Sequence, residues 1–142
     1  MVVDGTEYLV NKRNSYYIRN ISGNYYQMGV YCGGTLYKAE PVGSISKGIL
    51  THIVMVVDVD NSKVIGYSDG VEEDFTTTNG SSIDSSAFDL IISAFSSSAS
   101  LGSGQLPLFN MITDADAESI INKDLGKWVE KRWLKAKAKY GL

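Results

Sequence analysis

Cys32 and His52 are the only residues of their kinds in this 142-residue chain, and together they could supply nucleophilic chemistry. In a thiol hydrolase a histidine removes the cysteine proton, and an acidic or amide side chain orients the imidazole. His52 begins the most apolar segment of the sequence, and Asp69 follows the next candidate strand. The candidate catalytic residues, if the chain is an enzyme, are therefore Cys32, His52 and Asp69.

Residues 52–57, followed by Tyr67-Ser68-Asp69, resemble the histidine half of papain-like thiol peptidases. In that family the nucleophile opens a long helix, whose dipole lowers the pKa of the thiol. Cys32 instead ends a predicted strand ahead of two glycines, and only twenty residues separate it from His52. We therefore interpret Cys32 as a buried structural residue and predict a protein that is not an enzyme. A small papain-like hydrolase is the alternative.

Asp58 and Asp60 begin a short acidic turn that imitates the start of a calcium loop. An EF-hand needs glycine at the sixth position and a bidentate acid at the twelfth. Those positions hold Lys63 and Asp69 here, and the turn lies between predicted strands. One histidine and one cysteine are too few for a typical zinc site. Asp58 and Asp60 are thus weak metal candidates, and the sequence predicts no cofactor.

Charge is distributed unevenly along the chain. Residues 123–142 hold seven basic and two acidic side chains, a net charge of +5. The whole chain carries −3, so the other 122 residues carry −8. The candidate interface residues are the basic ones with a neighbouring tryptophan, Lys127, Lys131, Arg132, Trp133, Lys135 and Lys139, and the acidic Asp69, Glu72, Glu73 and Asp74.

The basic segment is expected to contact an acidic surface. Nucleic acid or another anion is one candidate partner, but a net charge of −3 gives an isolated chain no long-range attraction to it. A second copy needs no other molecule, because a basic end and an acidic end make a head-to-tail contact that can close a ring. We therefore predict that the partners are other copies of the chain or other subunits of an assembly.

These candidate residues must be positioned by strands in the first eighty residues. The segments 15–21 and 25–32, joined by Ser22-Gly23-Asn24, give the strongest hairpin pattern. Pro41 is expected to end the next strand or to mark it as an edge. Residues 53–57 are uniformly apolar, which predicts burial on both faces and a central place in the sheet.

A helix is predicted for residues 82–95, because apolar side chains recur there at three- and four-residue spacing. Ser82 or Asp84 can cap it, since a short side-chain oxygen accepts hydrogen bonds from the first free amides. Residues 96–104 are rich in serine and glycine and are expected to be a flexible connector.

The clearest helix is the basic C-terminal one, predicted over residues 113–140. Gly126 weakens a helix interior, which suggests a kink near Asp124, and Gly141 is the expected stop. Trp128 and Trp133 are about 140° apart around such a helix, so one can lie in the core while the other lies at its edge.

Together these elements predict an α+β fold in a single domain, residues 1–142, with about five to seven short strands in one antiparallel sheet and two helices. A lone cysteine and the absence of a signal peptide favour an intracellular, reducing compartment or a virion. No apolar stretch is long enough to span a bilayer. The composition favours a non-enzymatic structural or assembly protein, a subunit of a homo-oligomer or of a larger particle such as a phage or viral virion.

Overall fold

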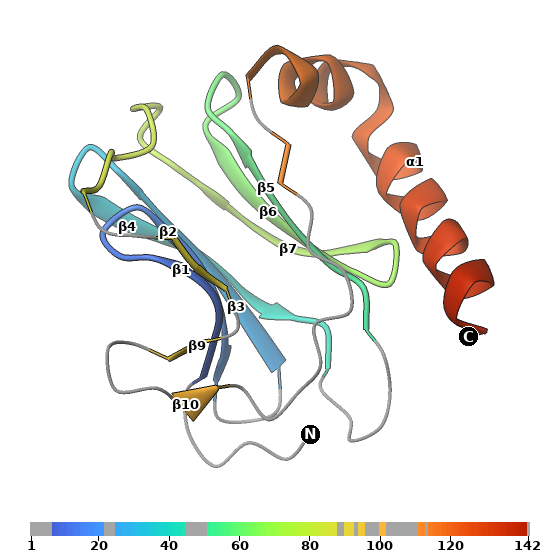
Figure 1. The fold of residues 1–142 in the computed structure, drawn as a ribbon. Coiled ribbons are helices and arrows are strands. Elements are labelled where there is room, and N and C mark those ends of the chain that lie inside the picture. Colours follow the sequence, from blue (N-terminus) through green and yellow to red (C-terminus); the bar gives the residue numbers. More distant parts are fainter. Residues whose placement is uncertain are drawn as a thin grey trace.

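The computed structural model describes residues 7–21, 25–44, 51–87, 90–92, 94–95, 100–101, 111–112 and 114–141. Over these residues the chain forms strands first and one long helix at its end (Figure 1). The strands are β1 (Glu7–Lys12), β2 (Tyr16–Ile21), β3 (Tyr25–Cys32), β4 (Thr35–Val42), β5 (Ile53–Asp58), β6 (Lys63–Ser68), β7 (Val71–Thr77), β8 (Leu90–Ile92), β9 (Ala94–Phe95) and β10 (Ser100–Leu101). The helix is α1 (Asp114–Tyr140).

The strands form two main antiparallel sheets. The first has the order β4-β3-β2-β1-β8 and the second the order β5-β6-β7, while β9 pairs with β10 separately. The hairpin predicted from the sequence is confirmed, because β2 and β3 pair with Tyr16 opposite Val30 and Ile21 opposite Tyr25. Most sheet neighbours are also neighbours in sequence, so short turns connect them.

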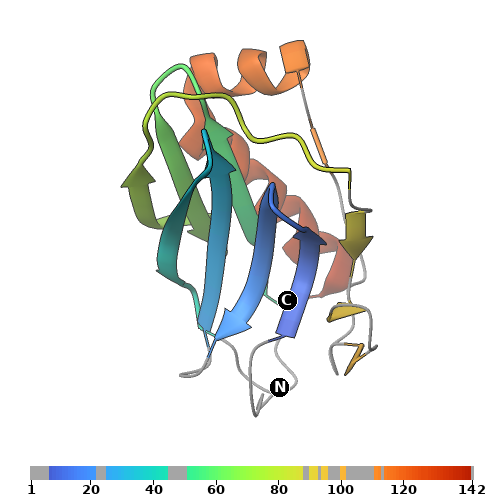
Figure 2. The same cartoon turned by 90° about the vertical axis from the view of Figure 1, so that its left-hand side faces the viewer.

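The β5-β6-β7 sheet lies between the first sheet and α1, so the molecule has three layers (Figures 1 and 2). The alternation of side chains along β6 shows this arrangement. Val64 is buried in a cluster with Val30 and Cys32 of the first sheet, whereas Ile65 and Tyr67 are buried in a cluster with α1. The middle sheet therefore packs on both faces.

β5 follows the same alternation, which explains the uniformly apolar run at residues 53–57. Met55 packs toward the first sheet, and Val56 packs in the cluster that α1 covers. Packing on both faces is thus confirmed. The predicted central place is wrong, because β6 is the middle strand and β5 lies at the edge of its sheet. Burial on both faces comes from the layers above and below the strand.

Gly66 allows the two sheets to approach closely. A Cβ atom at this position would overlap the side chain of Val42 on β4 and would lie 3.2 Å from the Met28 sulfur. Met28 and Val42 are fully buried. A glycine in a strand interior often marks such a close approach.

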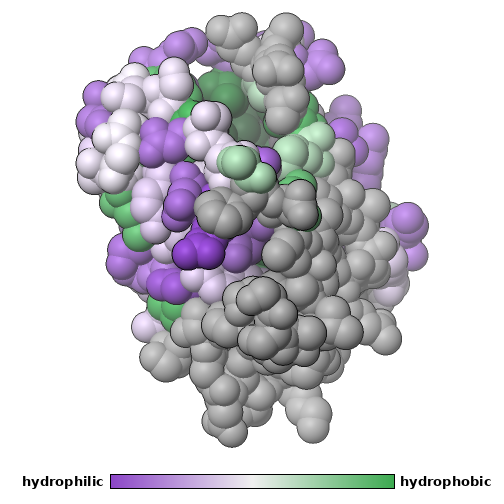
Figure 3. Space-filling model, turned by 60° about the vertical axis from the view of Figure 1, so that its left-hand side comes forward, coloured by the Kyte–Doolittle hydropathy of each residue, from purple (hydrophilic) through white to green (hydrophobic). Residues whose placement is uncertain are grey.

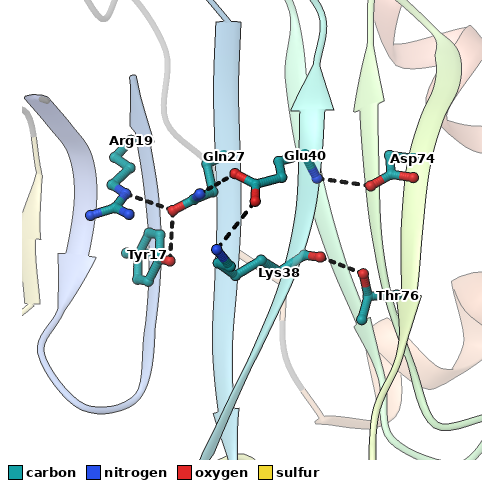
Figure 4. A network of polar contacts seen from close by, with 7 residues as sticks. All are labelled: Tyr17, Arg19, Gln27, Lys38, Glu40, Asp74 and Thr76. Atoms are coloured by element: carbon teal, nitrogen blue, oxygen red, sulfur yellow. Dashed lines mark hydrogen bonds and ion pairs between the residues drawn. The ribbon is translucent and has the colours of Figure 1, made fainter. Parts of the chain in front are cut away.

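β4 and β7 are edge strands of different sheets, and side chains connect them (Figure 4). Asp74 Oδ2 accepts a hydrogen bond from the Glu40 amide at 2.8 Å. Thr76 Oγ1 donates to the Lys38 carbonyl. We call these two contacts the β4–β7 seam. They cover the edge of β4 without a backbone ladder, and an uncovered edge would be open to pairing with another chain.

Polar contacts continue from the seam across β4, β3 and β2 (Figure 4). The Glu40 carboxylate pairs with Lys38 Nζ at 3.2 Å and accepts a hydrogen bond from the Gln27 amide. Gln27 Oε1 accepts from Tyr17 OH at 2.8 Å and from Arg19 Nε at 2.7 Å. Burial raises the pKa of Tyr17 to about 12, so this hydroxyl stays a donor. On the face of the molecule drawn in Figure 3, hydrophilic residues (purple) and residues of intermediate hydropathy (white) make up most of the coloured surface.

The predicted helix over residues 82–95 is wrong. Both oxygens of the Asp84 carboxylate accept hydrogen bonds at 2.8 Å from the amides of Gly33 and Gly34, so Asp84 secures the β3–β4 turn instead of capping a helix. Those two glycines have positive φ, which a residue with a Cβ rarely adopts. Ile83 bridges to Cys32, and β8 and β9 lie where the second half of the helix was expected. β8 pairs with the edge of β1.

The predicted α+β fold with two helices is therefore corrected: two antiparallel sheets and one C-terminal helix make the described part of the chain mostly β. Of the predicted connector, residues 100–101 form β10 and residues 96–99 and 102–104 lie outside the described residues. The predicted kink is confirmed by the non-helical backbone of Asp124, with φ −147° and ψ 82°. Gly141, with φ 68°, follows the last helical residue. Within the described ranges, no helix is both long and apolar enough to cross a bilayer.

Candidate functional site

α1 lies along the middle sheet and presents its apolar side to it. Val129 is fully buried, and it packs with Val56, Ile65 and Tyr67, with Ile121, Leu125 and Trp128 around them. At the kink the Asp124 carboxylate accepts a hydrogen bond from the Lys127 amide at 3.2 Å and pairs with the Lys127 ammonium at 3.1 Å. Asp124 thus acts as an N-cap for the second half of the helix, and most of the basic residues of that half face solvent.

A shallow hollow on α1 is lined by Trp128, Lys131, Arg132 and Lys135, with a volume of about 180 Å³. These positions are three or four residues apart and share one flank of the helix. The Arg132 guanidinium lies 4.9 Å from the centre of the Trp128 ring, a cation–π contact. We call this feature the tryptophan hollow. Three cations around an indole suit an anionic partner that also carries an apolar group.

The predicted interface cations differ in how far they are already engaged. Lys127 pairs with Asp124, and Lys139 Nζ lies 5.3 Å from the centre of the Tyr140 ring. Lys131 and Lys135 are exposed, and neither makes a hydrogen bond or an ion pair in the part of the chain that the structure describes. Among the predicted interface cations of the described residues, Lys131 and Lys135 at the tryptophan hollow are therefore the unengaged ones.

Two of the predicted interface acids serve the fold. Asp69 Oδ1 accepts a hydrogen bond from the His52 amide at 2.8 Å, and Asp74 is part of the β4–β7 seam. Because these carboxylates satisfy backbone amides, their replacement would disturb the fold as well as any contact with a partner.

The other two acids, Glu72 and Glu73 at the start of β7, are exposed. Glu72 Oε2 accepts a hydrogen bond from the Tyr67 hydroxyl at 3.2 Å. Glu73 lines a hollow of about 410 Å³ together with Gly43, Ser44, Ser68, Asp69 and Val71. We call Glu72 and Glu73, with the exposed Val71 beside them, the acidic strand end.

His52 connects the middle sheet to α1. Its ring stacks on Trp133 with centroids 6.0 Å apart and planes 18° apart. Its Nδ1 atom is buried, without a hydrogen-bond partner among the described residues. Burial lowers the pKa of His52 and nearby Arg132 lowers it further, whereas Asp69 opposes them. Trp133, a predicted interface residue, is thus partly occupied by a contact within the chain.

The structure brings His52 and Asp69 together but places Cys32 elsewhere. Cys32 is buried with Val30 and Val64, beside Val57 at the far end of β5 from His52. Five residues of strand span about 16 Å. Burial and Asp84 both raise the pKa of Cys32, which disfavours a thiolate. The geometry does not assemble the triad of a thiol hydrolase.

The weak metal candidates lie in the β5–β6 turn. The two oxygens of Asp58 accept hydrogen bonds from the backbone and side-chain amides of Asn61, at 3.0 and 2.8 Å, while Asp60 is exposed. Asp58 thus closes its own turn. The described ranges contain no group of three His, Cys, Asp or Glu residues placed to hold a metal ion.

Sequence reasoning missed two features of this surface. Trp128 packs against the cluster under α1 and also lines the hollow, and its spacing to Lys131, Arg132 and Lys135 is the signal in the sequence that could have predicted this. The roles of Asp69 and Asp74 in the fold had no signal in the sequence, because their partners are backbone amides 17 and 34 residues away. No protein-family model, curated protein or solved structure matches the chain.

Proposed function

We propose that this protein is a structural subunit that assembles with further copies of itself, in a homo-oligomer or in a larger particle such as a virion. One observation carries the proposal. The chain exposes unengaged cations at the tryptophan hollow and exposed carboxylates at the acidic strand end. A second copy offers each surface its complement without any other molecule.

Overall charge favours this partner over nucleic acid. The chain carries −3, and −8 lies outside residues 123–142, so a polyanion is repelled at long range. A second copy repels as well, but only through the same net charge of −3, and it supplies a local acidic surface. Nucleic acid or another anion bound through Lys127, Lys131, Arg132, Lys135 and Lys139 is the second candidate, because those side chains lie on the exposed part of one helix.

The test is the solution mass of the full chain, by light scattering, at about 0.01 M and about 1 M NaCl. Screening lengths of about 30 Å and about 3 Å at these concentrations make the contrast large. We expect several copies at low salt and a single copy at high salt. A single copy at both concentrations would reject the proposal.

Substitutions at exposed positions are a better probe than removal of the helix. A chain that ends at Asn122 would lose Val129 and expose Val56, Ile65 and Tyr67, which α1 now covers. Any change in mass could then come from aggregation through uncovered apolar surface. Exposed lysines and glutamates can be changed to glutamine without uncovering the core.

A further inference from the structure

The tryptophan hollow and the acidic strand end lie on opposite flanks of α1. Each residue turns an α-helix by about 100°. Relative to the buried Val129, Trp128, Arg132 and Lys135 lie about 60° to 120° to one side, whereas Glu130 and Lys137 lie about 80° to 100° to the other. Lys131, the fourth residue of the hollow, lies about 160° to the same side as Trp128, so the hollow extends from this flank to the outer face of the helix.

Contacts with the β6–β7 turn identify the two flanks. A Cβ atom on Gly70, in that turn, would lie 3.0 Å from Trp133 Cδ1 and 3.4 Å from Glu130 Cα. The Glu130 flank is thus next to the start of β7, where Glu72 and Glu73 are exposed. Because the sheet order is β5-β6-β7, the hollow lies on the β5 side. The influence of Arg132 on the pKa of His52, which precedes β5, agrees with this placement.

We infer that copies of this chain associate head to tail, with the acidic strand end of one copy seated in the tryptophan hollow of the next. This inference rests on the proposed function and names the surfaces and the symmetry of the assembly. Within one chain α1 separates the two surfaces, so they do not neutralise each other. Since they lie on opposite flanks of α1, a contact between two copies leaves one hollow and one strand end free.

The occupant fits the hollow in both of its properties. Glu73 and Val71 line the same hollow of about 410 Å³, so one side of β7 offers a carboxylate for the cations and an apolar group, 60% exposed, for the indole. Glu72 is opposite Tyr67 and accepts a hydrogen bond from its hydroxyl, so it lies on the other side of the strand and adds negative charge beside the contact. Charged pairs of this kind set orientation and register between partners. A contact between different surfaces continues from copy to copy and gives a ring or a filament, whereas a two-fold contact stops at two copies.

Two variants, each with two charged side chains replaced by neutral glutamine, test the inference. Lys131→Gln/Lys135→Gln removes charge from the hollow, and Glu72→Gln/Glu73→Gln removes it from the strand end. Each variant alone should have the mass of one copy at about 0.01 M NaCl, where the wild type has more than two. An equimolar mixture should have the mass of two copies and no more, because one productive contact forms per pair. Circular dichroism melts check that both variants are folded.

Matched controls change the same number of charges elsewhere. Lys123→Gln/Lys137→Gln lies on the same helix outside the hollow, and Asp60→Asn/Asp116→Asn removes two exposed acids. Both should keep the wild-type mass. Equal loss of mass in the controls would mean that net charge alone matters, and would overturn the inference.

The remaining outcomes distinguish a failure of the head-to-tail contact from a failure of the proposed self-assembly. A wild-type mass of two copies, or an assembly unaffected by both variants, would overturn the head-to-tail contact and leave self-assembly standing. A single copy at every salt concentration would reject both. A single copy that binds a single-stranded DNA oligonucleotide, with the affinity lost in Lys131→Gln/Lys135→Gln, would assign the hollow to nucleic acid instead.

Discussion

At the scale of the residue, the structure separates side chains that hold the fold from those available to a partner. Asp69 and Glu72 lie three residues apart in an acidic stretch, yet Asp69 satisfies a backbone amide and Glu72 is exposed. The sequence could predict that His52 precedes one strand and that Asp69 follows the next, so that the two residues lie at the same end of neighbouring strands. It could not predict the burial of Cys32 at the other end of β5, because the packing of one sheet on the other depends on segments that are far apart in the sequence.

Gly66 gives a prediction about the packing of the two sheets. Gly66→Ala should lower the free energy of unfolding by about 1–3 kcal/mol, because the new methyl group overlaps the buried Val42. Urea denaturation measures the change. In a Val42→Ala background the same substitution should cost less, since the smaller side chain leaves room. An equal cost in both backgrounds would contradict the proposed contact.

His52 gives a prediction about pH. Its pKa in the folded chain is lowered below 6.5, mainly by burial, so the unfolded chain takes up the proton first as the pH falls. The contribution of His52 to stability is complete above pH 6.5 and is lost as the pH falls through 6.5 toward the folded-state pKa. Urea denaturation at about pH 7.5 and about pH 5 should show a smaller loss of stability for His52→Gln than for the wild type. The same loss in both proteins would count against this role.

At the scale of the element, patterns that depend on local sequence could be predicted and patterns that depend on distant partners could not. The β2–β3 hairpin and the break at Asp124 follow from turn residues and a glycine in the helix. The segment 82–95 has helical spacing, but the amides of Gly33 and Gly34, which lie about fifty residues away, bind Asp84. Tertiary contacts override local preference in such segments.

The docking of α1 gives a prediction about the middle layer. Val129→Ala should cost about 1–3 kcal/mol of unfolding free energy, because Val129 is fully buried against the sheet. The matched control is Leu134→Ala on the same helix, where the side chain is 54% exposed and a change near zero is expected. Thermal melts of the two variants compare them directly. A larger effect at Leu134 would contradict the observed face of the helix.

The β4–β7 seam gives a second prediction at this scale. Thr76→Val keeps the shape of the side chain but removes the donor to the Lys38 carbonyl, and should cost about 1 kcal/mol. Thr77→Val is the control, because the next residue along β7 is exposed. Chemical denaturation should rank Thr76→Val below Thr77→Val in stability. The reverse order would show that the side chain does not support the seam.

At the scale of the whole molecule, the uneven charge of the sequence forms a basic surface, the tryptophan hollow, and an acidic surface, the acidic strand end, on opposite flanks of α1. The net +5 of residues 123–142 was visible in the sequence, but which cations stay unengaged and which flank they occupy depends on how α1 docks. A basic flank on the β5 side and an acidic strand end on the β7 side give each copy a direction. We therefore expect an assembly in which all copies point the same way, and its stability should fall as salt screens the contact.

The most direct measurement is the rescue of assembly by reversed charges. The triple variant Lys131→Glu/Arg132→Glu/Lys135→Glu and the double variant Glu72→Lys/Glu73→Lys are each expected to have the mass of one copy by light scattering at low salt. Mixed in equal amounts they should regain the wild-type mass, because each reversed hollow then meets a reversed strand end and each native surface a native one. Assembly by either variant alone, or a mixture that stays at one copy, would contradict a contact between the hollow and the strand end.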